Sequence, residues 1–454
     1  MNPARLRITG AAALDRLWQS FFVVPLLGML AGVGLGLGML AVDRAVGPTL
    51  GLPLVLTSTV ENGRAMLGTI ATATISVAGI AFSVSLLILQ QASAQFSPRV
   101  VHGLFRDPFN RRVMAVALGT FSYSLTVLRA VRDLEDSGPG IVVPNLSIAV
   151  AQVLGLAAVV AIVALIDHTA HTMEVSTVLQ RVLHEARTVP AERNGGDDGG
   201  GHDAGDGWPA GEPGTPALEV RADRGGWVQH LDRAALLGLV TDGGRVRVET
   251  GVGRFVVHGA PLLSLRPPPD DPDRAVERAR GAVLVGAGRT LMHDPPYGIR
   301  QLVDVALIAL SPGVNDPTTA QDAVLHATAL LRDLLVHPLQ RVHRDDRGRV
   351  LLLPRTPTAA DLVALTFAEV RRAAVALPAV CGYLLESLHE LHRSLPAEVR
   401  EDPVVATALR EQARLVVDGA AAAEPLPADL ALVRETHDRL FGRRTPVARD
   451  GHRA

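Results

Sequence analysis

The stretch from residue 289 to residue 316 gathers basic, acidic and amide side chains that could hold a ligand. Its polar members are Arg289, His293, Asp294, Arg300, Asp304, Asn315 and Asp316. Two interpretations are open. In the first, Asp294 and Asp316 cap helices that begin with the following proline, and Arg300 pairs with Asp304 one helical turn later. In the second, two helix starts with basic side chains nearby form a ligand or partner pocket.

A second group of residues has the spacing of metal ligands. Asp167, His168, His171 and Glu174 can share one face of a helix, and imidazole and carboxylate groups together bind metal ions. Polar residues that follow an apolar segment also lie commonly among lipid headgroups, which is the alternative. We therefore predict no cofactor and no firm metal site, with His168, His171 and Glu174 as weak candidates.

The sequence offers no set of nucleophile, base and orienting group. All 44 basic residues are arginine, so Schiff-base chemistry and a phosphate-binding P-loop lysine are excluded. Cys381 is the single cysteine, which excludes a CxxC redox or zinc motif. The net charge of -2 provides no basic excess for nucleic-acid binding. We expect a protein that is not an enzyme and does not bind nucleic acid.

A polar stripe follows one face of the apolar segment 65–95. Its positions alternate by three and four residues: Thr69, Thr72, Ser76, Gly79, Ser83, Leu86, Gln90, Ser93 and Ser97. One interpretation is that this face mediates contacts within a four-helix bundle. The other is that it lines a water-filled path in a homo-oligomer, with Leu86 as a hydrophobic constriction. In that case Arg99, Arg111 and Arg112 stand at the cytoplasmic mouth and favour anions.

Small residues also recur in the first apolar segment. Gly28, Gly32 and Gly36 are four residues apart, a spacing that lets two helix backbones approach closely in lipid. We predict close helix packing at these glycines, with a gating hinge as the alternative.

The elements that position these residues begin with four membrane spans. The chain is 48% hydrophobic and 20% charged, which indicates a mixture of embedded and water-exposed parts. Long charge-free runs predict spans at about 21–42, 65–95, 113–129 and 141–166, the third being the shortest. Apart from Arg129, which ends the third run, no Asp, Glu, Lys or Arg lies in these runs, which argues against proton-coupled carriers. The arginines before the first span and between the second and third predict cytoplasmic N- and C-termini.

The predicted fold is a four-helix transmembrane domain plus a cytoplasmic α+β region. Composition and periodicity divide the chain into a cytoplasmic N-terminus at 1–20, the membrane domain at 21–188, a disordered Gly/Pro/acidic linker at 189–216, a small β module at 217–266, a mainly helical domain at 270–442 and a disordered tail at 443–454. A further hairpin is expected around Asp345 to Gly348.

Several ordered segments resemble domain-of-unknown-function family 2254, a group of bacterial predicted membrane proteins. They are Thr72 to Phe82 (TATISVAGIAF), Gln95 to Arg99, Gly119 to Phe121, Leu128 with Arg129, His168, Gly298 to Leu302 and Ala309 to Ala320. In this family a His pair tends to follow the fourth span, whereas Asp167 precedes His168 here. The resemblance implies an integral membrane protein with a cytoplasmic C-terminal part. It implies no activity.

Two functional hypotheses follow. The first is an oligomeric protein of the bacterial inner membrane, with a channel-like path for a small ion along the second span and a regulatory cytoplasmic domain. The second is a membrane-anchored sensor or scaffold with a ligand or partner site in the 289–316 stretch. In both, the lipid bilayer is a partner.

Overall fold

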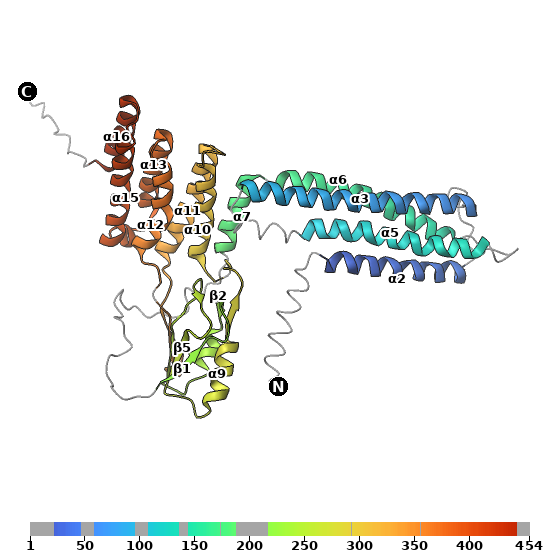
Figure 1. Ribbon diagram of the computed structural model, residues 1–454, viewed down its shortest axis with the longest axis horizontal. Helices are drawn as coiled ribbons and strands as arrows, with labels where there is room; N and C mark the ends of the chain where they lie inside the picture. The colour runs from blue at the N-terminus through green and yellow to red at the C-terminus, as the bar shows by residue number, and fades with distance from the viewer. Residues whose placement is uncertain are drawn as a thin grey trace, which may run out of the picture. The chain divides into compact units, whose positions relative to one another are not determined.

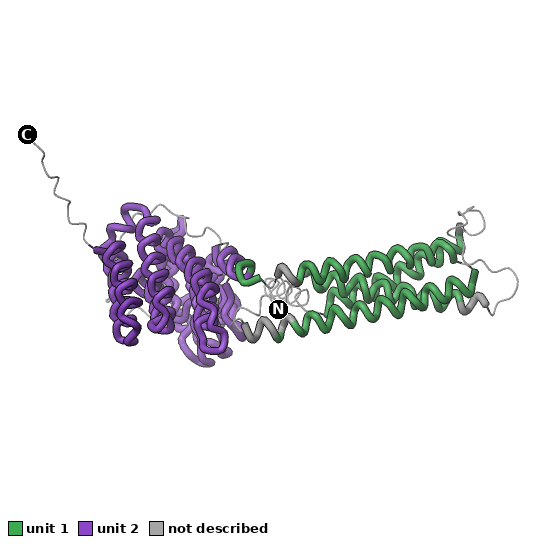
Figure 2. Tube along the Cα trace, turned by 90° about the horizontal axis from the view of Figure 1, so that it is seen from above, with its two compact units in different colours: residues 1–177 green, residues 178–454 purple. Residues whose placement is uncertain are grey.

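The computed structural model describes residues 22–46, 59–95, 108–135, 144–172, 174–187, 217–291, 293–354 and 356–442. The chain divides into two compact units, Met1–Thr177 and Val178–Ala454, which we call the membrane unit and the C-terminal unit (Figure 2). The predicted N-terminal segment, linker and tail at 1–20, 189–216 and 443–454 lie outside the described residues.

The membrane unit contains long apolar helices that lie side by side (Figure 1). Within the described residues they are α2 (Val23–Val46), α3 (Val60–Gln95), α5 (Pro108–Glu135) and α6 (Asn145–Thr172). Each is long and apolar enough to cross a membrane, over Val23–Ala45, Val60–Leu87, Phe109–Val131 and Asn145–Thr169. The predicted four-span fold is therefore confirmed.

Helix α5 is the central helix of the membrane unit, because it packs against α2, α3 and α6. This position explains why its sequence is the least apolar of the four spans. Thr120, Ser122, Tyr123 and Ser124 are buried among the neighbouring helices instead of facing lipid. A span surrounded by protein needs fewer apolar side chains than a span surrounded by hydrocarbon. The span is accordingly longer at both ends than the predicted 113–129.

One end of the membrane unit is fixed by polar contacts among three helices. The carboxylate of Asp43, on α2, accepts hydrogen bonds from the backbone N–H groups of Leu146 and Ser147 at 3.2 and 2.9 Å, and from the Ser147 hydroxyl. The hydroxyl of Tyr123 donates to the Ser147 carbonyl at 2.9 Å. Asp43 therefore caps the start of α6 from a different helix, where unpaired N–H groups and the helix dipole favour an anion.

Helix α7 (Val175–Arg187) follows α6 closely in the chain and carries one apolar face. Val178, Leu179, Val182 and Ala186 on this face are buried. The boundary between the two units falls after Thr177, so most of α7 belongs to the C-terminal unit. The sequence had assigned all of this helix to the membrane domain at 21–188.

The C-terminal unit contains two small sheets. The first has the strand order β1-β5-β3-β8-β7 and the second β4-β2-β6. Their bounds are β1 Leu218–Arg221, β2 Gly226–Leu231, β3 Arg245–Val248, β4 Phe255–Val256, β5 Pro261–Arg266, β6 Val283–Gly286, β7 Val342–Arg344 and β8 Val350–Leu352. Short helices α8 (Arg233–Leu237) and α9 (Pro272–Gly281) pack on them.

The sheets extend beyond the β module predicted at 217–266. Strand β6 follows α9 and pairs antiparallel with β2. The expected hairpin is confirmed as β7 and β8, and β8 pairs parallel with β3. Strands that are distant in sequence thus complete both sheets around a shared apolar core that includes Val246, Leu263 and Leu351.

The rest of the C-terminal unit is helical and its helices stand side by side (Figure 1). They are α10 (Pro295–Ala309), α11 (Pro317–Val336), α12 (Ala359–Ala373), α13 (Pro378–Ser394), α14 (Ala397–Arg400), α15 (Pro403–Ala422) and α16 (Pro427–Phe441). Most of them begin at a proline, which suits the first helical turn because its missing N–H has no partner there.

Candidate functional site

The polar stripe of α3 faces away from the other helices of the membrane unit. Its described side chains are all exposed: Thr69, Thr72, Ser76, Gly79, Ser83, Leu86 and Gln90. The opposite face of α3 is buried through Leu67, Ala78 and Ala81. The stripe therefore lies on the outer surface of a single copy, while the side chain of Ser93 and all of Ser97 lie outside the described residues.

The hydroxyl groups of the stripe are satisfied within α3 itself. Those of Thr69, Thr72, Ser76 and Ser83 each donate to the carbonyl four residues earlier, over 2.8–3.0 Å. Gly79 has open space where a Cβ would lie. The stripe is thus a shallow, neutral surface that another helix could approach closely.

The glycines of α2 form a close seam with α5. A Cβ built at Gly28 would lie 2.5 Å from the carbonyl oxygen of Ala115, and one at Gly32 would lie 2.8 Å from the carbonyl carbon of Gly119. At Gly36 the nearest atoms belong to an α5 side chain, 3.1 Å away. Two backbones meet here at distances that exclude any side chain on α2.

Two of the three arginines predicted at the cytoplasmic mouth lie in the described residues. Arg111 and Arg112 are the fourth and fifth residues of α5, and Arg99 lies outside the described residues. Arg112 lines a groove between α5 and α6.

The weak metal candidates do not converge in the described part of the chain. The ring of His168 packs on that of Phe109, with their centroids 4.5 Å apart. Glu174 is exposed and the side chain of His171 lies outside the described residues. No three His, Cys, Asp or Glu side chains form a metal-binding group among the described residues.

Arg289 and Asp294 form the centre of a group that we call the arginine–aromatic cluster, with Trp227, Tyr297 and the adjacent His230–His293 pair. The Arg289 Nε and Nη2 atoms donate to Asp294 Oδ2 at 2.9 and 2.6 Å. The guanidinium also lies 4.5 Å from the ring centre of Tyr297 and 5.7 Å from that of Trp227. Charge pairing and cation–π contact both hold this arginine in place.

The arginine–aromatic cluster joins strand β2 to the start of α10. Asp294 precedes α10 but makes no side-chain capping hydrogen bond, because its carboxylate turns to Arg289 instead. Burial raises the pKa of Asp294, and the charge of Arg289 opposes that shift. The rings of His230 and His293 pack in a tilted arrangement, with centroids 4.3 Å apart. These contacts indicate a structural junction between sheet and helices.

Arg300 and Asp304 belong to a separate ion-pair network. Arg300 lies 2.5 Å from Asp304 on the same helix and 2.5 Å from Glu369 on α12. The hydrogen bond to Glu369 is the main reason why the pKa of Arg300 is raised. The predicted pair is present, and Glu369 extends it into a link between α10 and α12.

Asn315 and Asp316 lie at the far end of α10 from His293. Asp316 caps α11 by accepting from the Thr319 N–H at 3.1 Å and the Thr319 hydroxyl at 2.6 Å. These hydrogen bonds lower the pKa of Asp316. Because α10 has 15 residues and a length of about 22 Å, the starts of α10 and α11 are far apart. The 289–316 stretch therefore makes three separate groups instead of the single pocket considered from the sequence.

The sequence did not indicate the partners that complete these groups. Trp227 and His230 come from β2, and Glu369 comes from α12, each some 60 residues or more from its partner. Local spacing carries no signal for such contacts. A sequence feature that could have indicated such a contact is Trp227, a large aromatic residue in a short strand.

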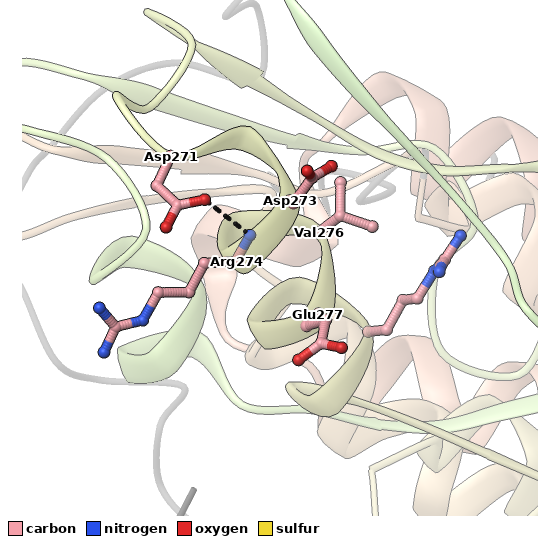
Figure 3. Close-up of a pocket in the computed structure, with 6 residues that line it drawn as sticks. Asp271, Asp273, Arg274, Val276 and Glu277 are labelled. Carbon is pink, nitrogen blue, oxygen red and sulfur yellow. Dashed lines mark hydrogen bonds between the residues drawn. The ribbon is translucent and has the colours of Figure 1, made fainter. Parts of the chain in front are cut away.

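A shallow hollow on α9 carries charges of both signs (Figure 3). Asp271 accepts from the backbone N–H of Arg274 at 3.1 Å and so caps this helix. Asp273 lies in the first turn, where the helix dipole favours a carboxylate. These acidic groups have a local structural role and do not point to a ligand.

A family model described as "Predicted membrane protein (DUF2254)" matches residues 18–390. The chain belongs to this family. The DUF2254 match runs from before α2 into α13, so it includes every described membrane span and both sheets. The resemblance seen in the sequence is thereby confirmed.

Two relatives come from mycobacteria. Uncharacterised proteins of Mycobacterium bovis and Mycobacterium tuberculosis are each 30% identical over 419 residues, which cover 90% of this chain and 78% of theirs. No solved structure matches the chain. DUF2254 membership and the four candidate spans establish a multi-pass membrane protein.

Proposed function

We propose that this protein is a non-enzymatic homo-oligomer of the bacterial inner membrane, in which α3 lines a channel-like path. The observation that carries the proposal is the outward direction of the polar stripe. Packing inside one copy does not account for Thr72, Ser76 or Ser83, because they are exposed. In an assembly around α3, these side chains would face water or the equivalent helix of another copy.

The stripe suits such a path better than it suits lipid. Its hydroxyls are satisfied by backbone carbonyls, so lipid contact costs them little, but Gln90 carries an exposed amide near the end of the span. Leu86 is 47% exposed on the same face. A ring of such leucines would be a narrow apolar constriction, which is a common way to close a pore by excluding water.

Helix α7 supports a regulatory role for the C-terminal unit. Gly298 on α10 has no room for a Cβ, since the Ala186 methyl on α7 would lie 2.8 Å away. Arg187 at the end of α7 pairs with Asp333 on α11 at 2.7 Å. Because α7 follows the last span in the chain, movement of these helices would be passed to the end of α6.

The orientation is part of the proposal. We place the N-terminus and the C-terminal unit in the cytoplasm, since the arginines flank the spans on that side. The sensor or scaffold alternative has less support, because Arg289, Arg300 and Asp316 each have a partner within the fold.

The test combines single cysteines with conductance measurements in planar bilayers. In a Cys381→Ser background, Ser76→Cys and Ser83→Cys should form cross-linked dimers, and a charged thiol reagent should block current through either variant. Ile80→Cys is the matched control, since it is exposed on α3 but lies off the stripe. A monomeric particle with no conductance under any ionic or tension condition would overturn the proposal.

A further inference from the structure

The groove between α5 and α6 combines a small-residue floor with a cationic end. Ala157, Ala161 and Ala164 of α6 form part of its lining, together with larger side chains of the same helix such as Leu156 and Val160. Its volume of about 560 Å³ is within the range of ligand sites. Apart from Arg112, every lining residue is apolar.

We propose that this groove binds an anionic phospholipid, with one acyl chain along the alanine floor and the phosphate on Arg112. The proposal is independent of any path along α3. A tail in a groove touches protein on more sides than a tail on a convex helix surface, and each added contact contributes dispersion energy. Leu156 and Val160 are 68% and 60% exposed, so lipid tails reach the α6 edge of the groove.

The length of the groove matches one leaflet. Its lining on α6 runs from Val153 to Ala164, a rise of about 16 Å. The hydrocarbon core of a bilayer is about 30 Å thick, so one leaflet contributes about half of that. An acyl chain that starts at the Arg112 end would therefore extend to the middle of the membrane.

Charge complementarity selects the headgroup. Arg112 lies one turn inside α5 and its guanidinium is exposed. No described carboxylate pairs with it. Phe109, with the ring of His168 packed against it, lies beside Arg112 at this end of the groove. A planar guanidinium at the level of the headgroups is suited to bind a phosphate through two parallel hydrogen bonds.

A helix from a second copy fits the groove less well than a lipid does. α5 and α6 pack directly on each other, so the groove is a furrow between touching helices. A helix lying on it would also cover Arg112 and remove that charge from water, at a high cost unless it supplied a carboxylate.

Native mass spectrometry of the full-length protein tests the proposal. The protein is purified in mild detergent, stripped of lipid and titrated with phosphatidylglycerol or phosphatidylcholine. We expect Arg112→Gln to lower the preference for phosphatidylglycerol about tenfold, the factor that loss of one charge-assisted contact would give. Arg129→Gln, which removes the same charge from the exposed far end of α5, should leave the preference unchanged.

A second variant tests the acyl-chain part of the site. Ala161→Leu fills the floor and should weaken retention of both lipids, whereas Ala31→Leu on the exposed face of α2 should not. Equal behaviour of Arg112→Gln and Arg129→Gln would overturn the headgroup assignment. If Ala161→Leu changes the oligomer mass and leaves lipid retention intact, the groove is an interface between copies and the proposal is wrong.

Discussion

Replacing Gly32 by alanine should loosen the α2–α5 seam, and the cost can be worked out from the structure. The new Cβ would lie 2.8 Å from the carbonyl carbon of Gly119, with the carbonyl oxygen nearer still. Ordinary contact begins at 3.4 Å, so the helices must separate by at least 0.6 Å. A gap of that size forfeits about a quarter to a half of the dispersion energy of each contact along the seam.

The expected destabilisation is about 1–3 kcal/mol, as for other overpacked sites. Gly34→Ala is the matched control, because it lies on the same helix and has nothing within 4 Å of its Cβ. Alanine is a better helix former than glycine by about 1 kcal/mol, and this gain applies equally to both variants. The difference between the two variants therefore isolates the packing term.

The assay is titration of sodium dodecyl sulfate into the full-length protein in mild detergent, followed by circular dichroism. Gly32→Ala should lower the free energy of unfolding most. Gly36→Ala should lower it less, because the nearest atoms belong to a side chain that can move. Gly34→Ala should leave it unchanged or raise it. Equal unfolding free energies for Gly32→Ala and Gly34→Ala would refute the assignment of this seam.

Three further predictions concern the C-terminal unit of the full-length protein. Gly253→Ala places a Cβ 2.8 Å from the carboxylate carbon of Asp294 in the arginine–aromatic cluster. It should therefore lower the free energy of unfolding by about 1–2 kcal/mol more than Gly259→Ala, where φ is similarly positive but the new Cβ meets open space. Chemical denaturation measures the free energy of unfolding of both variants, and an equal loss in the two would contradict the prediction. Asp316→Ala should cost about 1 kcal/mol at neutral pH through loss of the α11 cap. Because the folded pKa of Asp316 is lowered, this contribution is present above the pKa of an unfolded aspartate and disappears as pH falls through the folded value, so the two proteins should converge in acid. Burial raises the pKa of the Cys381 thiol to about 11, so a maleimide should label native protein about a hundredfold more slowly than unfolded protein by mass spectrometry. Rapid native labelling would show that this thiol is accessible.

The sequence predicted the existence of the membrane helices well, because hydrocarbon requires long apolar runs. It was least informative for α5, which proved to be the central helix. Polar residues such as Ser122 and Ser124 lower the mean hydropathy of that span, and only the packing shows that protein surrounds them. Mean hydropathy therefore underestimates the length of α5, the span that other helices cover most.

Composition alone does not locate the division between the two units. The Gly-rich acidic segment at 189–216 is the most visible change in composition, yet the units divide after Thr177. The signal that could have placed the boundary is the apolar face of α7, from Val178 to Ala186, because a short amphipathic helix after a span needs a protein surface to cover it.

The charged residues of the 289–316 stretch show what local spacing can and cannot establish. The cap at Asp316 and the pair Arg300–Asp304 are contacts within one or two turns, and both were predicted. The cluster at Arg289 depends on Trp227 from a strand some 60 residues earlier, and Arg300 is also bound by Glu369. Such partners follow from the tertiary fold, so the sequence could not choose between structural pairs and a pocket.

Small residues along one helix face have opposite surroundings in α2 and α3. Gly32 of α2 meets a backbone of α5, whereas Gly79 of α3 meets nothing within one copy. The spacing permits close approach in both cases, but only a partner backbone makes use of it. In α2 that partner is present and the glycines stabilise the fold. In α3 the same kind of surface is left uncovered, so packing within one copy explains the glycines of α2 but gives no contact to Gly79 or to the exposed Thr72 and Ser76.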